Sequence, residues 1–463
     1  MRKKMCWGLF AIGMIFCQRQ ALGQSVIDSQ VKEIIWRAFQ TNSDLKLQVY
    51  DVEKARVEAE GVKANKLPHV SATGLYGYLH SNGSLDLPTV YLPILNVGLF
   101  EGATDFDMST QAAYAGVSVR QVIFSGLQIP NGERALREKV RAQSYLAEAG
   151  KENIAKVIVF TFDQLMLLDQ VDKLILDSEK RLQKEQQKVN QAIANGMAIP
   201  YDREKLKLAL LELDEKKVEL AGNRDLLIKK IQQETGISTS EVQSVSYHLS
   251  PIYLSEIPTD VQERLELKAL DASSHAYEYL YKKERGAALP VVFAFGSANY
   301  LNVFNSNLTI KNRPIIGDVK LANNHLKGSP NLMVGVGVKW DLFSGGEHRN
   351  KVKLVKLDQA ISATKRMNAE EKLNLLLDKN KVDYTTVNKK LKVGDQQRKV
   401  AENNLLMASR QYQAGLIDIT ELLATENDWY KVSLNYYNHV LQQRSSALEL
   451  LHTSGKLLQM IHE

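Results

Sequence analysis

The spacing of apolar residues changes period along the chain, from that of a helix to that of a strand and back. Helical spacing over 27–65 predicts a helix, and Pro68 ends it because proline lacks an amide donor. Strict alternation then predicts a strand over 70–80. Its predicted apolar face carries Val70, Ala72, Gly74, Tyr76 and Tyr78.

A second alternating segment predicts a strand over 114–124, and the Gly-, Pro- and Asp-containing residues between the two strands predict a long loop. Helix-forming sequence follows and predicts long helices over 127–195 and 200–235. At 1.5 Å per residue the first would be about 100 Å long. A heptad spacing typical of a coiled-coil seam links Leu206, Leu213, Leu220 and Leu227.

The same order of elements recurs later in the chain, with strands predicted over 291–300 and 332–343 and helices over 346–413 and 418–453. An Asn-rich loop is expected between these strands, and a shorter helix is expected before them, from about 260 to 283. The elements therefore form two copies of one unit.

Landmark residues support the duplication. An offset of 219 relates Phe124 to Phe343, Gly196 to Gly415 and Gly236 to Gly455, whereas Leu67-Pro68 recurs as Leu289-Pro290 at an offset of 222. We therefore predict structural repeats over 24–236 and 259–455. A linker, 237–258, would separate them, and a C-terminal tail, 456–463, would follow.

The fourth predicted strand has the clearest pattern, with an apolar residue at every even position from Leu332 to Leu342. A water-soluble sheet with one face on a core would alternate in the same way. The neighbouring helices are long and polar, with no thick apolar face to cover a sheet, so lipid is the favoured cover. Four strands cannot close a barrel, since the smallest single-chain membrane barrels have about eight. We therefore predict a cyclic oligomer.

The first 23 residues have the order of a secretory signal: basic Arg2, Lys3 and Lys4, then an apolar run, then small residues before a cut after Gly23. An uncleaved anchor and acylation of Cys17 are the alternatives. Cleavage would remove both cysteines and four basic residues, which lowers the net charge from +6 to +2. A nearly balanced exported chain gives no electrostatic reason to expect nucleic acid.

The sequence contains no motif for a zinc protease, a phosphate loop or a dinucleotide site. Its nine histidines are dispersed, and none forms a metal-binding pair with a carboxylate at helical spacing. We therefore expect no enzyme activity, no catalytic residue, no cofactor and no metal site.

The repeated motifs resemble those of the TolC-like outer-membrane efflux proteins. The resemblance rests on the two Leu-Pro pairs, on Val122–Gly126 and Trp340–Gly346, and on Tyr412–Leu416 followed by Leu422-Leu423 and Gly455. It implies a mainly α fold with a β-barrel portion. Three chains would form one twelve-stranded barrel in the outer membrane and a long coiled-coil tunnel of helices in the periplasm.

The resemblance also implies a function and its partners. Such channels work with an inner-membrane pump and a periplasmic adaptor in tripartite efflux or type I secretion, as passive ducts for drugs, other small molecules or proteins. The alternative from another class is a periplasmic coiled-coil structural or adaptor protein whose strands form a soluble sheet.

Site residues follow from the same resemblance. The helix-tip turns would meet the adaptor and close the pore; they comprise Asn195, Gly196, Ala414, Gly415 and Leu416. The periplasmic gate would contain Asp202, Tyr412 and Glu421, and Ile417 and Ala424 depart from the polar residues expected in it. The alternative for Asp202 and Glu421 is an acid in the first turn of a helix, where the helix dipole favours it, and both interpretations can hold at once. Carboxylates confined in a narrow opening would attract cations and raise one another's pKa.

Two strand-to-helix corners complete the set of candidate sites. They are expected where each chain leaves the membrane. Glycine at each corner permits the bend from strand to helix. Their residues are Phe124, Ser125, Gly126, Phe343, Ser344 and Gly345.

Overall fold

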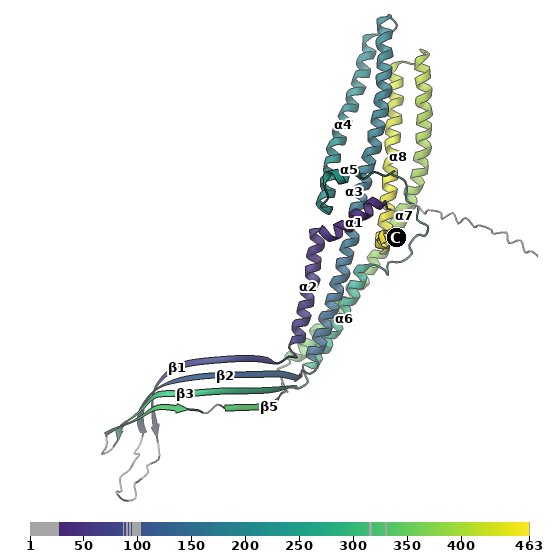
Figure 1. The fold of residues 1–463 in the computed structure, drawn as a ribbon. Helices are drawn as coiled ribbons and strands as arrows, with labels where there is room; N and C mark the ends of the chain where they lie inside the picture. Colours follow the sequence, from purple (N-terminus) through teal and green to yellow (C-terminus); the bar gives the residue numbers. More distant parts are fainter. Residues whose placement is uncertain are drawn as a thin grey trace, which may run out of the picture. The chain divides into compact units, whose positions relative to one another are not determined.

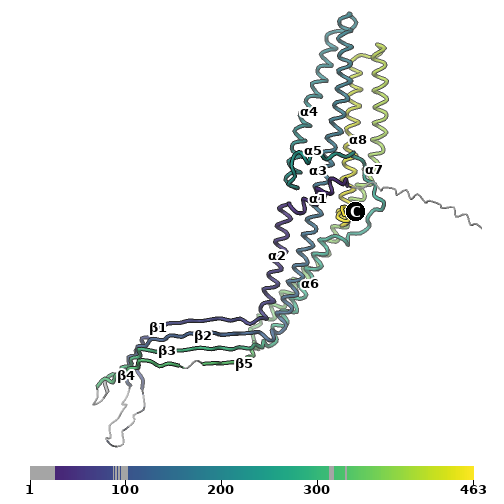
Figure 2. The backbone as a smooth tube through the Cα atoms, in the orientation of Figure 1, coloured from purple at the N-terminus to yellow at the C-terminus, as the bar shows by residue number. Residues whose placement is uncertain are grey.

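The computed structural model describes residues 27–86, 88, 91, 94, 103–313, 317–328 and 331–462. The predicted signal peptide, with Cys6 and Cys17, lies outside the described residues. The chain is mostly helical with an antiparallel sheet (Figures 1 and 2). In chain order its elements are α1 Ser29–Thr41, α2 Ser43–Ala64, β1 His69–Asp86, β2 Ala103–Phe124, α3 Gln128–Ala194, α4 Pro200–Thr235, α5 Thr239–Ser244, α6 Leu265–Gly286, β3 Val291–Arg313, β4 Gly317–Lys327, β5 Asn331–Lys339, α7 Glu347–Gln413, α8 Ile419–Ser454 and α9 Leu457–His462.

The long helices repeat in length as well as in order. Helices α3 and α7 have 67 residues each, and α4 and α8 have 36 each. Both ends of α7 and α8 are displaced from those of α3 and α4 by 219 residues, the offset already seen in single landmarks. The duplication therefore covers whole elements.

The chain divides into two compact units, and each contains residues of both repeats. One unit comprises 1–46, 148–264 and 371–463, and the other comprises 47–147 and 265–370. The sequence repeats are thus not separate compact bodies.

Buried residues at heptad spacing line the helices of the first unit. The pattern holds in α3 (Ile175, Leu182, Val189), α4 (Leu206, Leu213, Leu220), α7 (Leu377, Tyr384, Leu391) and α8 (Ile419, Glu426, Ser433, Val440, Ala447). Leu227, the next heptad position in α4, is only half-buried, and Ile228 is buried instead. A straight helix of 3.6 residues per turn drifts against a repeat of 3.5, which accounts for the change.

The single helix predicted over 27–65 is wrong, because the structure breaks it at Asn42 into α1 and α2. The Asn42 Oδ1 atom accepts hydrogen bonds from the backbone amides of Asp44 and Leu45, at 3.0 and 3.2 Å. Its Nδ2 atom donates to the carbonyl oxygen of Glu234 in α4 at 3.1 Å. Asn42 therefore caps α2 and ties the break to another helix.

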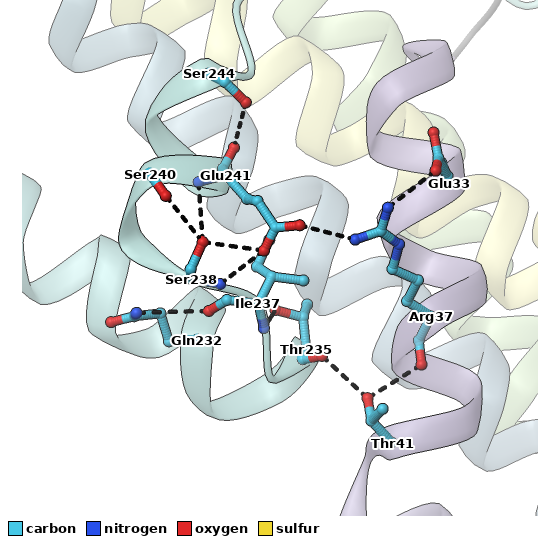
Figure 3. A network of polar contacts seen from close by, with 10 residues as sticks. All are labelled: Glu33, Arg37, Thr41, Gln232, Thr235, Ile237, Ser238, Ser240, Glu241 and Ser244. Carbon is cyan, nitrogen blue, oxygen red and sulfur yellow. Dashed lines mark hydrogen bonds and ion pairs between the residues drawn. The ribbon is translucent and has the colours of Figure 1, made fainter.

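A polar network joins α1 to the end of α4 and to α5 (Figure 3). Arg37 of α1 lies between Glu33, at 3.1 Å, and Glu241 of α5, at 2.9 Å. Ser238 and Glu241 form a capping box at the start of α5, in which each side chain bonds the other residue's backbone amide. This part of the predicted linker, 237–258, is thus an ordered helix that an ion pair links to α1.

The rest of the linker is bonded to the long helices of the same unit. The Gln443 side chain bonds both backbone groups of Ile252, accepting at 2.8 Å and donating at 2.6 Å. Buried Asp163 accepts from Arg444 at 2.8 Å and from the Tyr247 hydroxyl at 2.7 Å. These bonds hold the linker against α3 and α8.

The predicted strand boundaries need correction. Strands β1, β2 and β3 extend well into the segments expected to be loops, and β4 lies wholly inside the expected Asn-rich loop. The segment between β1 and β2 lies partly outside the described residues. At the other end, β5 stops at Lys339, short of the predicted 343. The Trp340 indole instead donates to the carbonyl of Ala288 at 3.0 Å.

The described strands number five and not the predicted four, but they occupy four positions in the sheet. The order is β1-β2-β3, and β3 then pairs with both β4 and β5 along successive stretches. Between those stretches the Gly328 amide donates to the Leu301 carbonyl at 2.9 Å. Strands β4 and β5 therefore act as one interrupted strand.

The two faces of the sheet differ in chemistry. On one face the β5 valines are open, with Val334 87% and Val336 67% exposed. On the other, the rings of Phe295 and Phe293 cover Gly335 and Gly337, so that a Cβ at either glycine would press into a ring. The sheet thus leaves an apolar face uncovered in the single chain.

Candidate functional site

The two helix-tip turns have the same backbone. Gly196 and Gly415 have φ values of 73° and 72°, a left-handed conformation that favours glycine. The Met197 amide donates to the Ala192 carbonyl at 2.8 Å, and the Leu416 amide donates to the Gln411 carbonyl at 2.9 Å. Each long helix therefore ends in a Schellman-type turn. Asn195 and Ala414 directly precede the glycines and donate to the carbonyls of Gln191 and Arg410.

The helices that follow the turns begin differently. The Asp418 carboxylate caps α8 by accepting from the Glu421 amide at 2.9 Å, and this bond holds the pKa of Asp418 below its ordinary value. At the equivalent position Ile199 provides no side-chain cap, and Pro200 opens α4 instead. Lys205 of α4 donates to the Thr420 hydroxyl of α8 at 2.6 Å and so links the N-terminal ends of the two helices.

Asp202 and Tyr412 are brought together in a cavity of about 430 Å³ between the two turns. Glu185 and both tip helices also line it. Burial raises the pKa of the half-buried Tyr412, and the charges of Asp202 and Glu185 raise it further. The position of these carboxylates beside the phenol favours the protonated, hydrogen-bond-donating form of Tyr412.

Glu421 lies elsewhere. It lines a groove of about 1020 Å³ between α7 and α8, together with Asp428, Lys392 and Lys431. Ile417 lines both the groove and the tip cavity. Within one chain, therefore, two of the three predicted gate residues meet and the third faces a separate groove.

An ion pair between α3 and α8 was not predicted. Arg181 of α3 donates three hydrogen bonds to the Glu426 carboxylate of α8, at 2.7–3.1 Å, and its guanidinium lies 4.1 Å from the centre of the Trp429 ring. The Glu426 side chain is 9% exposed. The heptad spacing from Ile419 to Glu426 could have identified a carboxylate in the seam, since buried charges are usually paired.

The strand-to-helix corners also form a matched pair. The hydroxyl of Ser125 accepts from the Ile129 amide at 3.1 Å, and that of Ser344 accepts from the His348 amide at 3.4 Å. Gly126 and Gly345 have φ values of 63° and 61°. Phe124 ends β2, whereas Phe343 lies beyond the end of β5 and is 90% exposed.

The surroundings of the two corner glycines differ. A Cβ at Gly126 would collide with the carbonyl oxygen of Gly286 at the end of α6. Nothing among the described residues lies within 4 Å of a Cβ at Gly345. One corner is thus packed within the chain and the other is open.

The part of the chain that the structure describes contains neither a membrane-spanning helix nor a cluster of metal ligands. No described helix is both long enough and apolar enough to cross a membrane. No described group of three or more His, Cys, Asp or Glu side chains could hold a metal ion.

Solved structures with the same fold cover nearly the whole chain. The outer membrane channel CmeC of Campylobacter jejuni is 15% identical with a TM-score of 0.70, over 93% of this chain and 86% of that one. A membrane protein from Pseudomonas aeruginosa is 14% identical with a TM-score of 0.72, over 93% and 95%. The open state of the MtrE outer membrane channel of Neisseria gonorrhoeae is 13% identical with a TM-score of 0.68, over 93% and 90%.

Sequence comparison covers a shorter region. No curated protein matches the chain significantly. Residues 259–456, which include the whole of the second predicted repeat, match the family model for outer membrane efflux proteins. The fold and this match together confirm that the chain resembles the TolC-like outer-membrane efflux proteins.

Proposed function

We propose that this protein is the outer-membrane channel of a tripartite efflux or type I secretion system. Three copies form a passive duct that exports drugs, other small molecules or proteins and carries out no chemistry of its own. The sheet lies in the outer membrane, and the long helices extend into the periplasm. A periplasmic adaptor and an inner-membrane pump complete the system.

The observation that carries this proposal is the uncovered apolar face of the sheet. Its valines in β5 are mostly exposed, and the seams of the long helices are already filled by one another. An apolar face of this extent on a water-soluble monomer would favour aggregation. Lipid would cover this face in the outer membrane, and the match of residues 259–456 to the family model for outer membrane efflux proteins supports lipid.

The number of strand positions supports more than one copy, and the resemblance to the TolC-like proteins implies three. Each chain contributes four positions, so three chains supply twelve, well above the minimum of about eight for a membrane barrel. Cyclic symmetry closes such a ring with one kind of interface. The proposed adaptor contact is at the helix tips, where the turns at Gly196 and Gly415 are open to a partner.

Cell fractionation tests this proposal. The wild-type chain should appear in the outer-membrane fraction and migrate on gels as an oligomer until it is heated. Val336→Lys, on the apolar face, should lower the amount recovered there, since lysine at mid-membrane costs about 2–4 kcal/mol. Lys207→Glu, on an exposed face of α4, is the control and should leave recovery unchanged.

The competing function is a periplasmic coiled-coil structural or adaptor protein with a soluble sheet. It predicts release of the wild-type chain with the soluble periplasmic proteins and no effect of Val336→Lys on its distribution. That result would refute the channel.

A further inference from the structure

The sheet has two free edges in the single chain. Among the described residues β1 pairs only with β2, and β5 pairs only with β3. A free edge presents unpaired backbone donors and acceptors that another strand can bond. The duplicated register indicates which strand bonds each free edge and in which alignment.

The two hairpins have the same internal register. In the first, His69 lies opposite Arg120, and all paired residue numbers add up to 189. In the second, Val291 lies opposite Lys339, and they add up to 630. The two totals differ by 441, which is the sum of the sequence offsets: 222 from β1 to β3 and 219 from β2 to β5. Strand β1 is therefore equivalent to β3, and β2 to β5, residue by residue.

Strands β2 and β3 join the first repeat to the second. From Gln111 to Val122 the paired numbers add up to 415, as in Val117 opposite Ala298. Replacing β2 with its equivalent β5 adds 219 to one residue number, and replacing β3 with its equivalent β1 subtracts 222 from the other. The pairing becomes one between β5 and β1, in which the paired residue numbers add up to 412. The described strands of one chain do not make that pairing, so a second copy would supply one of the two strands.

We propose that β5 of one copy pairs antiparallel with β1 of a second copy in this register. Val336 then lies opposite the partner's Tyr76, and Val334 lies opposite the partner's Tyr78. The inference rests on the proposed oligomeric channel and adds the identity and alignment of the strands that close it.

The chemistry of the faces agrees with this register. Paired residues of antiparallel strands lie on the same face. Because the paired residue numbers add up to the even total of 412, even-numbered residues of β5 pair with even-numbered residues of the partner's β1. The exposed valines of β5 therefore lie beside the partner's Tyr76 and Tyr78, which continue the apolar face. A slip by one residue would place them on the opposite face from those tyrosines.

The corners provide a second, independent observation. Gly126 packs against Gly286, the last residue of α6. The same offsets convert this contact into one between Gly345 and the partner's Ala64, the last residue of α2. Gly345 has the conformation of Gly126 and open space around it, as this contact requires.

Cysteine cross-linking in the full-length protein tests the register. Oxidation of Val336→Cys/Tyr76→Cys should give dimers and covalent trimers on non-reducing gels, and reductant should remove them. The intrachain positive control is Val117→Cys/Ala298→Cys, the equivalent pair, which should oxidise without changing the oligomer size. Each single-cysteine variant should give no ladder.

The alignment is tested by Val336→Cys/Tyr78→Cys, in which the partner position is shifted by two residues. Cysteines that face each other directly suit a disulfide, whereas diagonal neighbours are about 7–8 Å apart. This pair should therefore cross-link at least several-fold less. More product from the shifted pair, or no intermolecular product while the control oxidises, would overturn the register. Outer-membrane recovery and the heat-sensitive oligomer would then persist, whereas failure of the proposed function would abolish both.

Discussion

Charged side chains at the junction of α3 and α8 show how single residues depend on their surroundings. Arg264 donates to the carbonyl of His452, and Lys156 lies 3.5 Å from the His452 ring. Burial, followed by the charges of Arg264 and Lys156, lowers the pKa of His452 to about 3. The imidazole is therefore neutral in the folded protein near neutral pH.

This burial predicts a loss of stability in acid. The unfolded chain binds a proton at His452 near pH 6.5 and the folded chain does so only near 3, so stability falls as the pH drops below 6.5. Between pH 7.5 and 5.0 the contribution of His452 should fall by about 2 kcal/mol. Urea unfolding followed by helical circular dichroism should show it, and His452→Gln should remove it.

Exposed His275 provides the matched control. His275→Gln should retain the full acid sensitivity. An equal loss of stability in wild type and His452→Gln would show that other groups are responsible.

At the scale of elements, the heptad seams explain how the long helices pair as hairpins. Leu182 and Val189 of α3 belong to one buried cluster with Leu206 and Leu213 of α4. Such packing, more than helix propensity, holds a long polar helix together.

The seam predicts the effect of a truncation in α4. Leu213→Ala should destabilise the α3–α4 hairpin by about 2–4 kcal/mol, because it removes a buried side chain and leaves a cavity. Faster amide hydrogen exchange in α4 would report the loss. Leu226→Ala, in the same helix but 65% exposed, should change exchange little; equal effects of both variants would exclude the seam as the cause.

The sequence predicted the long helices well because two signals agreed. Heptads such as Leu206 to Leu220 gave the seam, and the glycines at 196 and 415 marked the turns. The strands were harder to predict. Their outer parts show apolar alternation only in short runs such as Phe106 to Met108 and Leu308 to Ile310, too short to mark a strand within the polar residues around them. Backbone pairing, which does not require alternation, extends the strands through these parts and through β4.

The break at Asn42 has only a weak local signal, an N-cap residue followed by Asp44 in the first turn of α2. No proline or glycine marks it, and the residue is fixed by a contact with Glu234, nearly two hundred positions away. For the site, the spacing identified the turns, but only the fold could place Asp202 and Tyr412 in one cavity and Glu421 in another.

At the scale of the whole molecule, the proposed gate contains three copies of each tip residue, one from each chain. Asp202→Ala with Glu421→Ala should raise the single-channel conductance or reduce block by multivalent cations in bilayer recordings, since rings of carboxylates attract cations. Asp225→Ala, an exposed acid far from the tip in α4, is the control and should leave both unchanged. Unaltered currents in the double variant would place the constriction elsewhere.

The equal lengths of the paired helices restrict how this protein can evolve. Helices α3 and α7 have 67 residues each, and the turns after them meet around one cavity. An insertion of two turns in α3 alone would carry its turn about 10 Å beyond the other. A longer or shorter form of the proposed duct therefore requires matched changes in both halves of the gene.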